Sequence, residues 1–255
     1  MLLTTDAIVL HCFDYSETSR IVRLLTRDAG VQSAMARGAR RAKSRFGTAL
    51  DLFAQGPAQI HMKEGRELQT LGAFEINKSR SGIGGDLGRF ASASAVVELV
   101  LRFGAVDETN QEMFDAVAES LDRIAESEPA RAGEAGLAGA WRLVSQLGFA
   151  PSLDGCAVCH DEIQDSASAP FSHAAGGVVC RSCSRQYPGA RALPPAARAA
   201  VGAWCETGAS DAEPLATREL RAHQRLLREF LQQHVADGRA LSAFDVWELG
   251  AWSSV

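Results

Sequence analysis

Residues 20–37, RIVRLLTRDAGVQSAMAR, decide the fold of the N-terminal part of this chain. The first six are rich in Ile, Val and Leu, which favour a β-strand. The next five, TRDAG, have the composition of a turn, because Asp28 and Gly30 supply the side-chain and backbone properties that turns need. Side chains then alternate over residues 31–37, so that one face could be buried. The stretch therefore predicts a strand, a turn and a second strand.

Three further segments have the composition of short strands. Residues 7–13, AIVLHCF, form an apolar run, and AQIHM (58–62) is separated from LQTLGAFEI (68–76) by the polar connection KEGRE. Five short strands within about 70 residues, with no helix of normal length among them, indicate a small closed barrel. We expect a five-stranded OB-fold, nucleic-acid-binding domain over residues 1–78.

The pattern changes after this region. The glycine-rich segment SRSGIGGDLG (79–88) is interpreted as a flexible linker, and the apolar period is helical from there on. Helices are expected at 87–103, 110–125, 137–147, from 193 onwards and at 217–235, with a stop signal at Gly238. The sequence thus predicts an α+β multidomain protein, in which an α-helical domain of residues 79–153 and 188–255 follows the barrel.

Four of the six cysteines follow the spacing C-x2-C-x20-C-x2-C: Cys156, Cys159, Cys180 and Cys183. Two such turns can surround one Zn²⁺ with four thiolates, which predicts a zinc ribbon inserted at residues 154–187. Two disulfides are the alternative, which a reducing compartment disfavours. Because four thiolates leave no position for water, the expected zinc is structural, one per chain. His160 and His173 lie nearby and could substitute as ligands.

Charge is unevenly distributed in a chain whose net charge is −5: residues 1–80 hold 12 Lys/Arg and 8 Asp/Glu, so all of the acidic excess lies beyond them. Five cations occur within ARGARRAKSRFG (36–47): Arg37, Arg40, Arg41, Lys43 and Arg45. Such a cluster favours a partner rich in phosphate, although a solvated loop is the alternative. Arg20 and Arg23 on the neighbouring strand, with Lys63 and Arg66, would extend the DNA-binding surface. Phe46, Phe53 and Tyr15 are the nearby aromatic residues that could stack on bases.

Sequence motifs for catalysis are missing: there is no P-loop, no G-x-S-x-G and no H-E-x-x-H. A binding function is therefore expected rather than an enzyme, and a zinc hydrolase is disfavoured by the closed ligand set. The N-terminal residues lack the features of a secretory signal, and no apolar run is long enough for a membrane span. We expect a cytoplasmic protein.

Several of these motifs together resemble one family. YSETSRIVRLLTRDAG (15–30), ARGARRAKSRFGTALDLF (36–53) and LQTLGAFEI (68–76) are similar to the N-terminal domain of the RecO family of bacterial recombination mediators, and the two C-x2-C pairs resemble the zinc module of many of its members. The resemblance implies that the protein has no enzyme activity. It implies that the protein is nucleoid-associated, binds single- and double-stranded DNA and anneals complementary strands. It also implies that the protein works with RecR, binds the acidic tail of single-strand-binding protein, and helps to load RecA. The apolar, acidic C-terminal end departs from the basic segment expected there. The alternative is an RNA-binding or ribosome-associated factor, because both modules also serve RNA.

The last expected helix carries a cationic face. Four arginines follow one another at helical spacing: Arg218, Arg221, Arg225 and Arg228. Beside the apolar side of this helix, they could hold an acidic peptide with a hydrophobic end, such as the tail of single-strand-binding protein. The alternative is a solvated surface on which Glu219 and Glu229 pair with the arginines.

Overall fold

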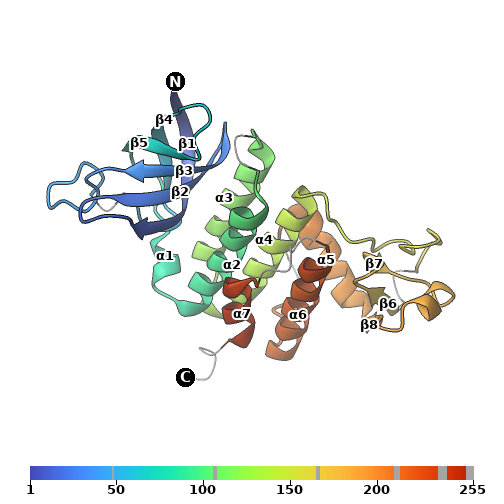
Figure 1. Ribbon diagram of the computed structural model, residues 1–255. Helices are drawn as coiled ribbons and strands as arrows, with labels where there is room; N and C mark the ends of the chain where they lie inside the picture. Colours follow the sequence, from blue (N-terminus) through green and yellow to red (C-terminus); the bar gives the residue numbers. More distant parts are fainter. Residues whose placement is uncertain (48, 106–107, 165–166, 210–212, 235–239, 251–255) are drawn as a thin grey trace.

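The computed structural model describes residues 1–47, 49–105, 108–164, 167–209, 213–234 and 240–250 (Figure 1). Five strands form a closed barrel in the order β1-β2-β3-β5-β4, an OB-like arrangement that confirms the fold expected for this region. The strands are β1 (Leu2–Asp14), β2 (Arg20–Thr26), β3 (Gly30–Ala36), β4 (Gln55–His61) and β5 (Leu68–Phe74).

The barrel interior is filled by small and aliphatic side chains that alternate along the strands. Val22 and Leu24 of β2 face Ala34 and Ala36 of β3 in one buried cluster. Because side chains in a strand point alternately to opposite faces, Ile21, Arg23 and Leu25 lie on the outside. The alternating pattern of β2 and β3 therefore separates a packed interior from an outer face.

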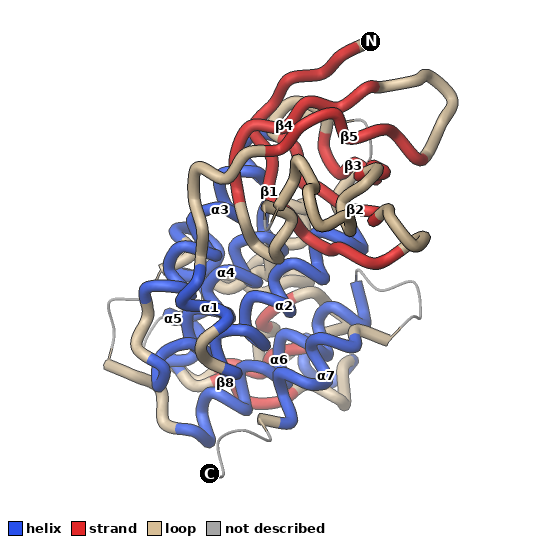
Figure 2. Tube along the Cα trace, turned by 90° about the vertical axis from the view of Figure 1, so that its left-hand side faces the viewer, coloured by secondary structure: helices blue, strands red, loops and turns tan. Residues whose placement is uncertain are grey.

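A helical bundle follows the barrel (Figure 2). Its helices are α1 (Ser81–Gly84), α2 (Leu87–Phe103), α3 (Gln111–Glu126), α4 (Ala132–Gln146), α5 (Pro195–Thr207), α6 (Thr217–His234) and α7 (Ser242–Leu249). Helix α4 contacts α2, α3, α5 and α6. Its glycines permit this close packing, because a Cβ at Gly136 or Gly139 would lie 2.8 Å from a serine Cβ of α2 or α3. The expected helices are present, α4 begins five residues earlier than expected, and neither α1 nor α7 was expected. The stop signal at Gly238 lies outside the described residues.

The junction between barrel and bundle is built around Arg80. Its side chain, only 2% exposed, donates hydrogen bonds to the carbonyl oxygen of Phe53 (2.7 Å) and to Asp122 of α3 (2.8 Å). Burial lowers the pKa of Arg80, and the nearby Asp122 opposes that shift. Ile83, which follows, is also fully buried. The segment expected as a flexible linker is thus a packed connection in this part.

The cysteine-containing insertion lies at the opposite end of the bundle from the barrel (Figure 1). Its strands β6 (Ala169–Ser172) and β7 (Gly177–Val178) form a sheet with β8 (Arg191–Leu193), which lies beyond the expected boundary at residue 187; the order is β7-β6-β8. Two short 3₁₀ helices, Pro129–Arg131 and Cys183–Gln186, complete the described elements. Phe171 of β6 is buried and packs near Phe230 of α6, with ring centroids 6.2 Å apart. The insertion therefore shares its apolar core with the bundle.

Candidate nucleic-acid interface and metal centre

The basic segment, residues 37–47, begins the connection between β3 and β4. Phe46 and, further along the same connection, Leu50 are buried in the apolar cluster of the barrel, each with 3% of its surface exposed. All five cations of the segment are exposed. Consecutive turns shape it, with backbone hydrogen bonds from Arg41 to Gly38 and from Ser44 to Arg41. The apolar anchors thus hold a fixed segment against the barrel and leave the cations in solvent.

Two of the predicted cations share one carboxylate. Asp14, at the end of β1, pairs with Arg20 at 3.1 Å and with Arg40 at 3.2 Å. Arg40 also donates to the carbonyl oxygen of Ser16 (2.8 Å), and its backbone N–H donates to Thr18. Arg40 therefore fastens the basic segment to the β1–β2 hairpin, in addition to carrying charge.

The other cations of the segment differ in their surroundings. Arg45 lies over the ring of Phe46, 4.9 Å from its centroid. Arg37, Arg41 and Lys43 form no ion pair with other residues in the described parts of the chain. These three side chains have the greatest freedom to contact a phosphate.

Arg23 occupies a different position from the other predicted cations. It lies on the outer face of β2, half-buried, and donates a hydrogen bond to the carbonyl oxygen of Leu101 in α2 (3.3 Å). Burial lowers its pKa. Arg23 also lines a hollow of about 980 Å³, together with Lys63 and Arg66 of the β4–β5 connection. Arg66 further shares a hollow of about 370 Å³ with Arg37.

The expected stacking residues are mostly inaccessible. Phe46 and Phe53 are both 3% exposed: Phe46 fills the barrel, and Phe53 packs edge-on against Phe90 of α2. Tyr15 is 58% exposed, at the tip of the β1–β2 hairpin. The expectation for the two phenylalanines was wrong because Phe46 anchors the basic segment in the barrel core and Phe53 packs against the helical bundle.

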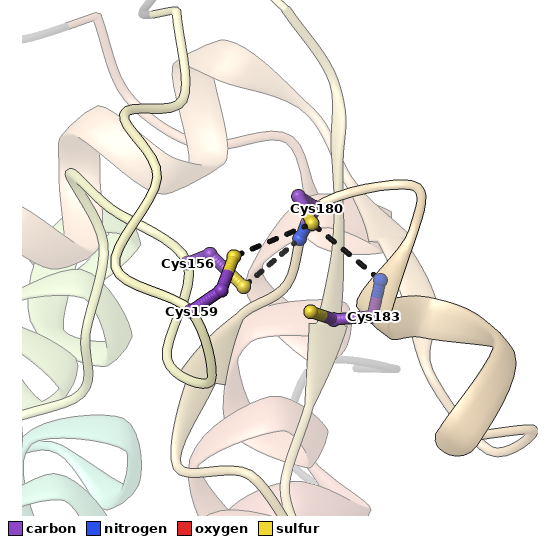
Figure 3. Close-up of side chains that lie close together, drawn as sticks. All are labelled: Cys156, Cys159, Cys180 and Cys183. Carbon is purple, nitrogen blue, oxygen red and sulfur yellow. Dashed lines mark hydrogen bonds between the residues drawn. The ribbon is translucent and has the colours of Figure 1, made fainter.

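The four predicted cysteines converge at one point (Figure 3). Their Sγ atoms all lie within 4.8 Å of one another, and those of Cys159 and Cys180 are 3.7 Å apart. The backbone N–H of Cys180 donates to Cys156 Sγ (3.3 Å), and that of Cys183 donates to Cys180 Sγ (3.5 Å). Four sulfur ligands from two C-x2-C turns match the donor set and spacing that zinc prefers, so the cluster fits a metal ion.

The environment of Cys156 favours a thiolate. Burial acts to raise the pKa of this thiol, but hydrogen bonds from the backbone N–H groups of Cys159, Cys180 and Val158 outweigh it and lower the pKa to about 6. His173 does not belong to the group of possible metal ligands. Its ring contacts the carbonyl oxygen of Leu226 in α6 (3.3 Å) instead. Within the described residues, only the four cysteines form a metal-binding group.

The arginine face of α6 is partly engaged. Arg225 and Arg228 both approach Glu248 of α7, at 3.8 and 2.5 Å. Arg218 and Arg221 are exposed and form no ion pair with any residue that the structure describes.

The two glutamates expected to pair with these arginines are used elsewhere. Glu219 accepts the backbone N–H of Ala216, and Glu229 contacts Arg191. Glu248, on α7, forms ion pairs with Arg225 and Arg228 in place of these two glutamates.

A cavity of about 500 Å³ opens beside this face, between α5, α6 and β8. Apolar side chains such as Leu226 and Ala200 line it, and Arg225, Glu213 and Glu219 are among its polar residues. His223 also lines it, and burial lowers the pKa of this histidine to about 4, so the ring is neutral at pH 7. The cavity could accept an apolar side chain from a partner.

None of the helices in the described part of the chain combines the length and the apolar character that a membrane span requires.

Comparison with known proteins identifies relatives along nearly the whole chain. Residues 1–80 match the family model "Recombination protein O N terminal", and residues 84–242 match "Recombination protein O C terminal". The chain is 34% identical over 241 residues to DNA repair protein RecO of Anaeromyxobacter dehalogenans, with 92% of each chain covered. It is 30% identical over 246 residues to DNA repair protein RecO of a Nocardioides species, covering 96% of this chain and 99% of the relative. This chain therefore belongs to the RecO family.

Proposed function

We propose that this protein is a non-catalytic DNA-binding factor of recombinational DNA repair. In this proposal it anneals complementary strands and, with RecR, helps RecA load onto DNA coated by single-strand-binding protein, in the cytoplasm at the nucleoid. The observation that carries the proposal is the exposed row of cations on an anchored segment at one end of an OB-like barrel.

Such a surface suits strand annealing for an electrostatic reason. Contacts from guanidinium and ammonium groups to phosphates are independent of base sequence. A strand held through its backbone keeps its base edges available for a complementary strand. Arg37, Arg41 and Lys43 have the exposure that this role requires.

The proposal is tested by annealing of complementary oligonucleotides that have been coated with single-strand-binding protein. We expect annealing to accelerate with protein concentration and to slow steeply as salt is raised, because phosphate contacts release counterions. In parallel, competition with single-stranded RNA separates DNA repair from an RNA-binding function. Preference for RNA, or no acceleration of annealing, would refute the proposal.

We further propose that the cysteine cluster holds one structural zinc ion per chain. The four thiols are close enough to share an ion, and backbone N–H groups donate to the sulfur atoms of Cys156 and Cys180, which supports thiolates at these two positions. When bound, the metal would hold together an insertion whose strands are only two to four residues long.

The arginine face of α6 is proposed to bind the acidic tail of single-strand-binding protein. Arg218 and Arg221 would receive the carboxylates, and the hydrophobic end of the peptide would enter the cavity beside Leu226. Arg225 and Arg228 would contribute at the border, where they also hold α7 through Glu248.

Charge reversal at Arg218 and Arg221, which form no ion pair with any described residue, tests the peptide site. We expect Arg218→Glu combined with Arg221→Glu to weaken binding of a fluorescent acidic, hydrophobic-ended peptide about tenfold, measured by anisotropy. The matched control is Arg41→Glu with Lys43→Glu, which makes the same charge change on the barrel. Equal peptide affinity for the α6 variant and the unmodified protein would exclude this site.

A further inference from the structure

A row of apolar side chains crosses the outer face of the barrel near the β1–β2 hairpin. In the strand register, Phe13 of β1 lies opposite Ile21 of β2, Ile21 lies opposite Met35 of β3, and Met35 lies opposite Thr70 of β5. The neighbours Cys12 and Val22 belong to the interior cluster, so Phe13 and Ile21 point outward. The same alternation places Met35 outside, because Ala34 and Ala36 are inside.

This row is open to solvent, unlike the outer positions further along the same strands. Phe13 is 42% exposed, and Ile21 and Met35 are partly exposed. By contrast, Leu25 of β2 and Val31 of β3 are 2% exposed, because they pack against the helical bundle. The bundle thus covers one half of the outer face and leaves the apolar row uncovered.

Cations lie on both sides of the row. Arg23 follows Ile21 by two residues within β2, so it lies on the outer face about 7 Å along that strand. Arg37 lies in the turn just beyond the end of β3 and lines a hollow together with Met35. The hollow of about 370 Å³ that Arg37 shares with Arg66 also includes Met35 and Thr70, at the β5 end of the row. An apolar strip with an aromatic side chain is therefore bordered by Arg23, Arg37 and Arg66, while the nearby Asp14 is paired with Arg20 and Arg40 and Glu67 lines the same hollow as Arg37.

We propose that the row Phe13–Ile21–Met35 is a base-stacking strip for single-stranded DNA. A base stacks on the Phe13 ring, its neighbour packs on Ile21 and Met35, and the phosphates lie toward Arg37 and Arg23. The proposal deepens the DNA-binding function argued above and rests on it, because it assigns contacts to the bases in addition to those to the backbone.

The combination of an apolar strip, an aromatic ring and bordering cations favours single-stranded DNA as the ligand. Bases of a single strand present open faces that stack on aromatic side chains, whereas those of a duplex are stacked on one another. A purely cationic surface would bind both forms through phosphates alone. The strip therefore favours single strands, while the basic segment serves either form.

Phe13→Ala tests the strip, with Phe149→Ala as the matched control. Phe149 is 39% exposed, close to the exposure of Phe13, but it follows α4 and lies three residues before Ser152, which hydrogen-bonds to Gly176 in the insertion at the other end of the bundle from the barrel. The probes are a fluorescent single-stranded oligonucleotide and an abasic sugar–phosphate chain of the same length. We expect Phe13→Ala to lower affinity for the oligonucleotide about tenfold, or about 1.4 kcal/mol, without changing its salt slope. Affinity for the abasic chain should be unchanged, and Phe13→Trp should retain full affinity.

The outcomes separate this proposal from the wider one. Equal affinity of Phe13→Ala and the unmodified protein for the oligonucleotide would overturn the strip, and so would equal losses on the base-bearing and abasic chains. Either result leaves backbone binding by the basic segment intact. If the unmodified protein binds neither chain, the proposed DNA-binding function fails, and the strip fails with it.

Discussion

Replacing Cys156 by serine is expected to reduce bound zinc from about one ion per chain to nearly none. The Cys156 side chain is fully buried, and its sulfur receives the backbone N–H of Cys180, so it links the two C-x2-C turns. A serine hydroxyl does not replace a thiolate as a zinc ligand. Because structural zinc contributes roughly 10–16 kcal/mol in small zinc-binding peptides, its loss should unfold the insertion. Metal analysis of the purified protein and limited proteolysis of residues 154–187 measure the two effects.

Cys12→Ser is the matched control, since Cys12 is a half-buried thiol of β1, outside the cluster. It should keep both zinc and resistance to protease. The structural role is wrong if Cys156→Ser retains zinc at the level of the unmodified protein. It is also wrong if the unmodified protein carries far less than one ion per chain.

Reversing charge at Arg41 and Lys43 is expected to weaken single-stranded DNA binding on the order of a hundredfold at moderate salt. These side chains are exposed and have no ion-pair partner among the residues that the structure describes, so the change removes little from the fold. Two lost phosphate contacts should lower the slope of log affinity against log salt by about 1.4. Titrations of a labelled single strand at several salt concentrations measure both quantities.

Arg40 is a poorer choice for this experiment. It pairs with Asp14 and hydrogen-bonds the β1–β2 hairpin, so its reversal would disturb the segment as well as its charge. Arg218→Glu with Arg221→Glu is the control of equal charge on α6, and it should keep the salt slope of the unmodified protein. A slope for the Arg41/Lys43 variant equal to that of the unmodified protein would contradict the proposed interface.

Features that depend on residues close together in sequence were predictable. The five strands, the helices α2, α3, α5 and α6, and the cysteine cluster follow from local alternation, helical spacing and the C-x2-C pairs. Helix α7 was missed because it is short and is held by distant groups. Glu98 of α2 accepts the backbone N–H groups of Ala243 and Phe244, and the indole of Trp247 donates to Ser92 (3.0 Å).

The accessible part of the candidate interface was less predictable. The sequence locates a dense cationic segment, but it does not separate Arg40, which is tied to Asp14, from Arg41, which has no ion-pair partner in the part of the chain that the structure describes. The apolar residues at and just beyond the end of the segment offered a signal. Phe46 and Leu50 lie four residues apart, and both proved to be anchors in the barrel core.

The amino-acid sequence by itself determined where the barrel strands and the long helices form, which four thiols can share a metal, and where positive charge gathers, because these properties depend on near neighbours along the chain. Only the tertiary structure decided which side chains remain available. Arg80 finds its carboxylate 42 residues away, in Asp122, and the bundle covers Leu25 while leaving Phe13 exposed. Burial and ion pairing of this kind depend on which distant surfaces meet, and local sequence patterns do not contain that information.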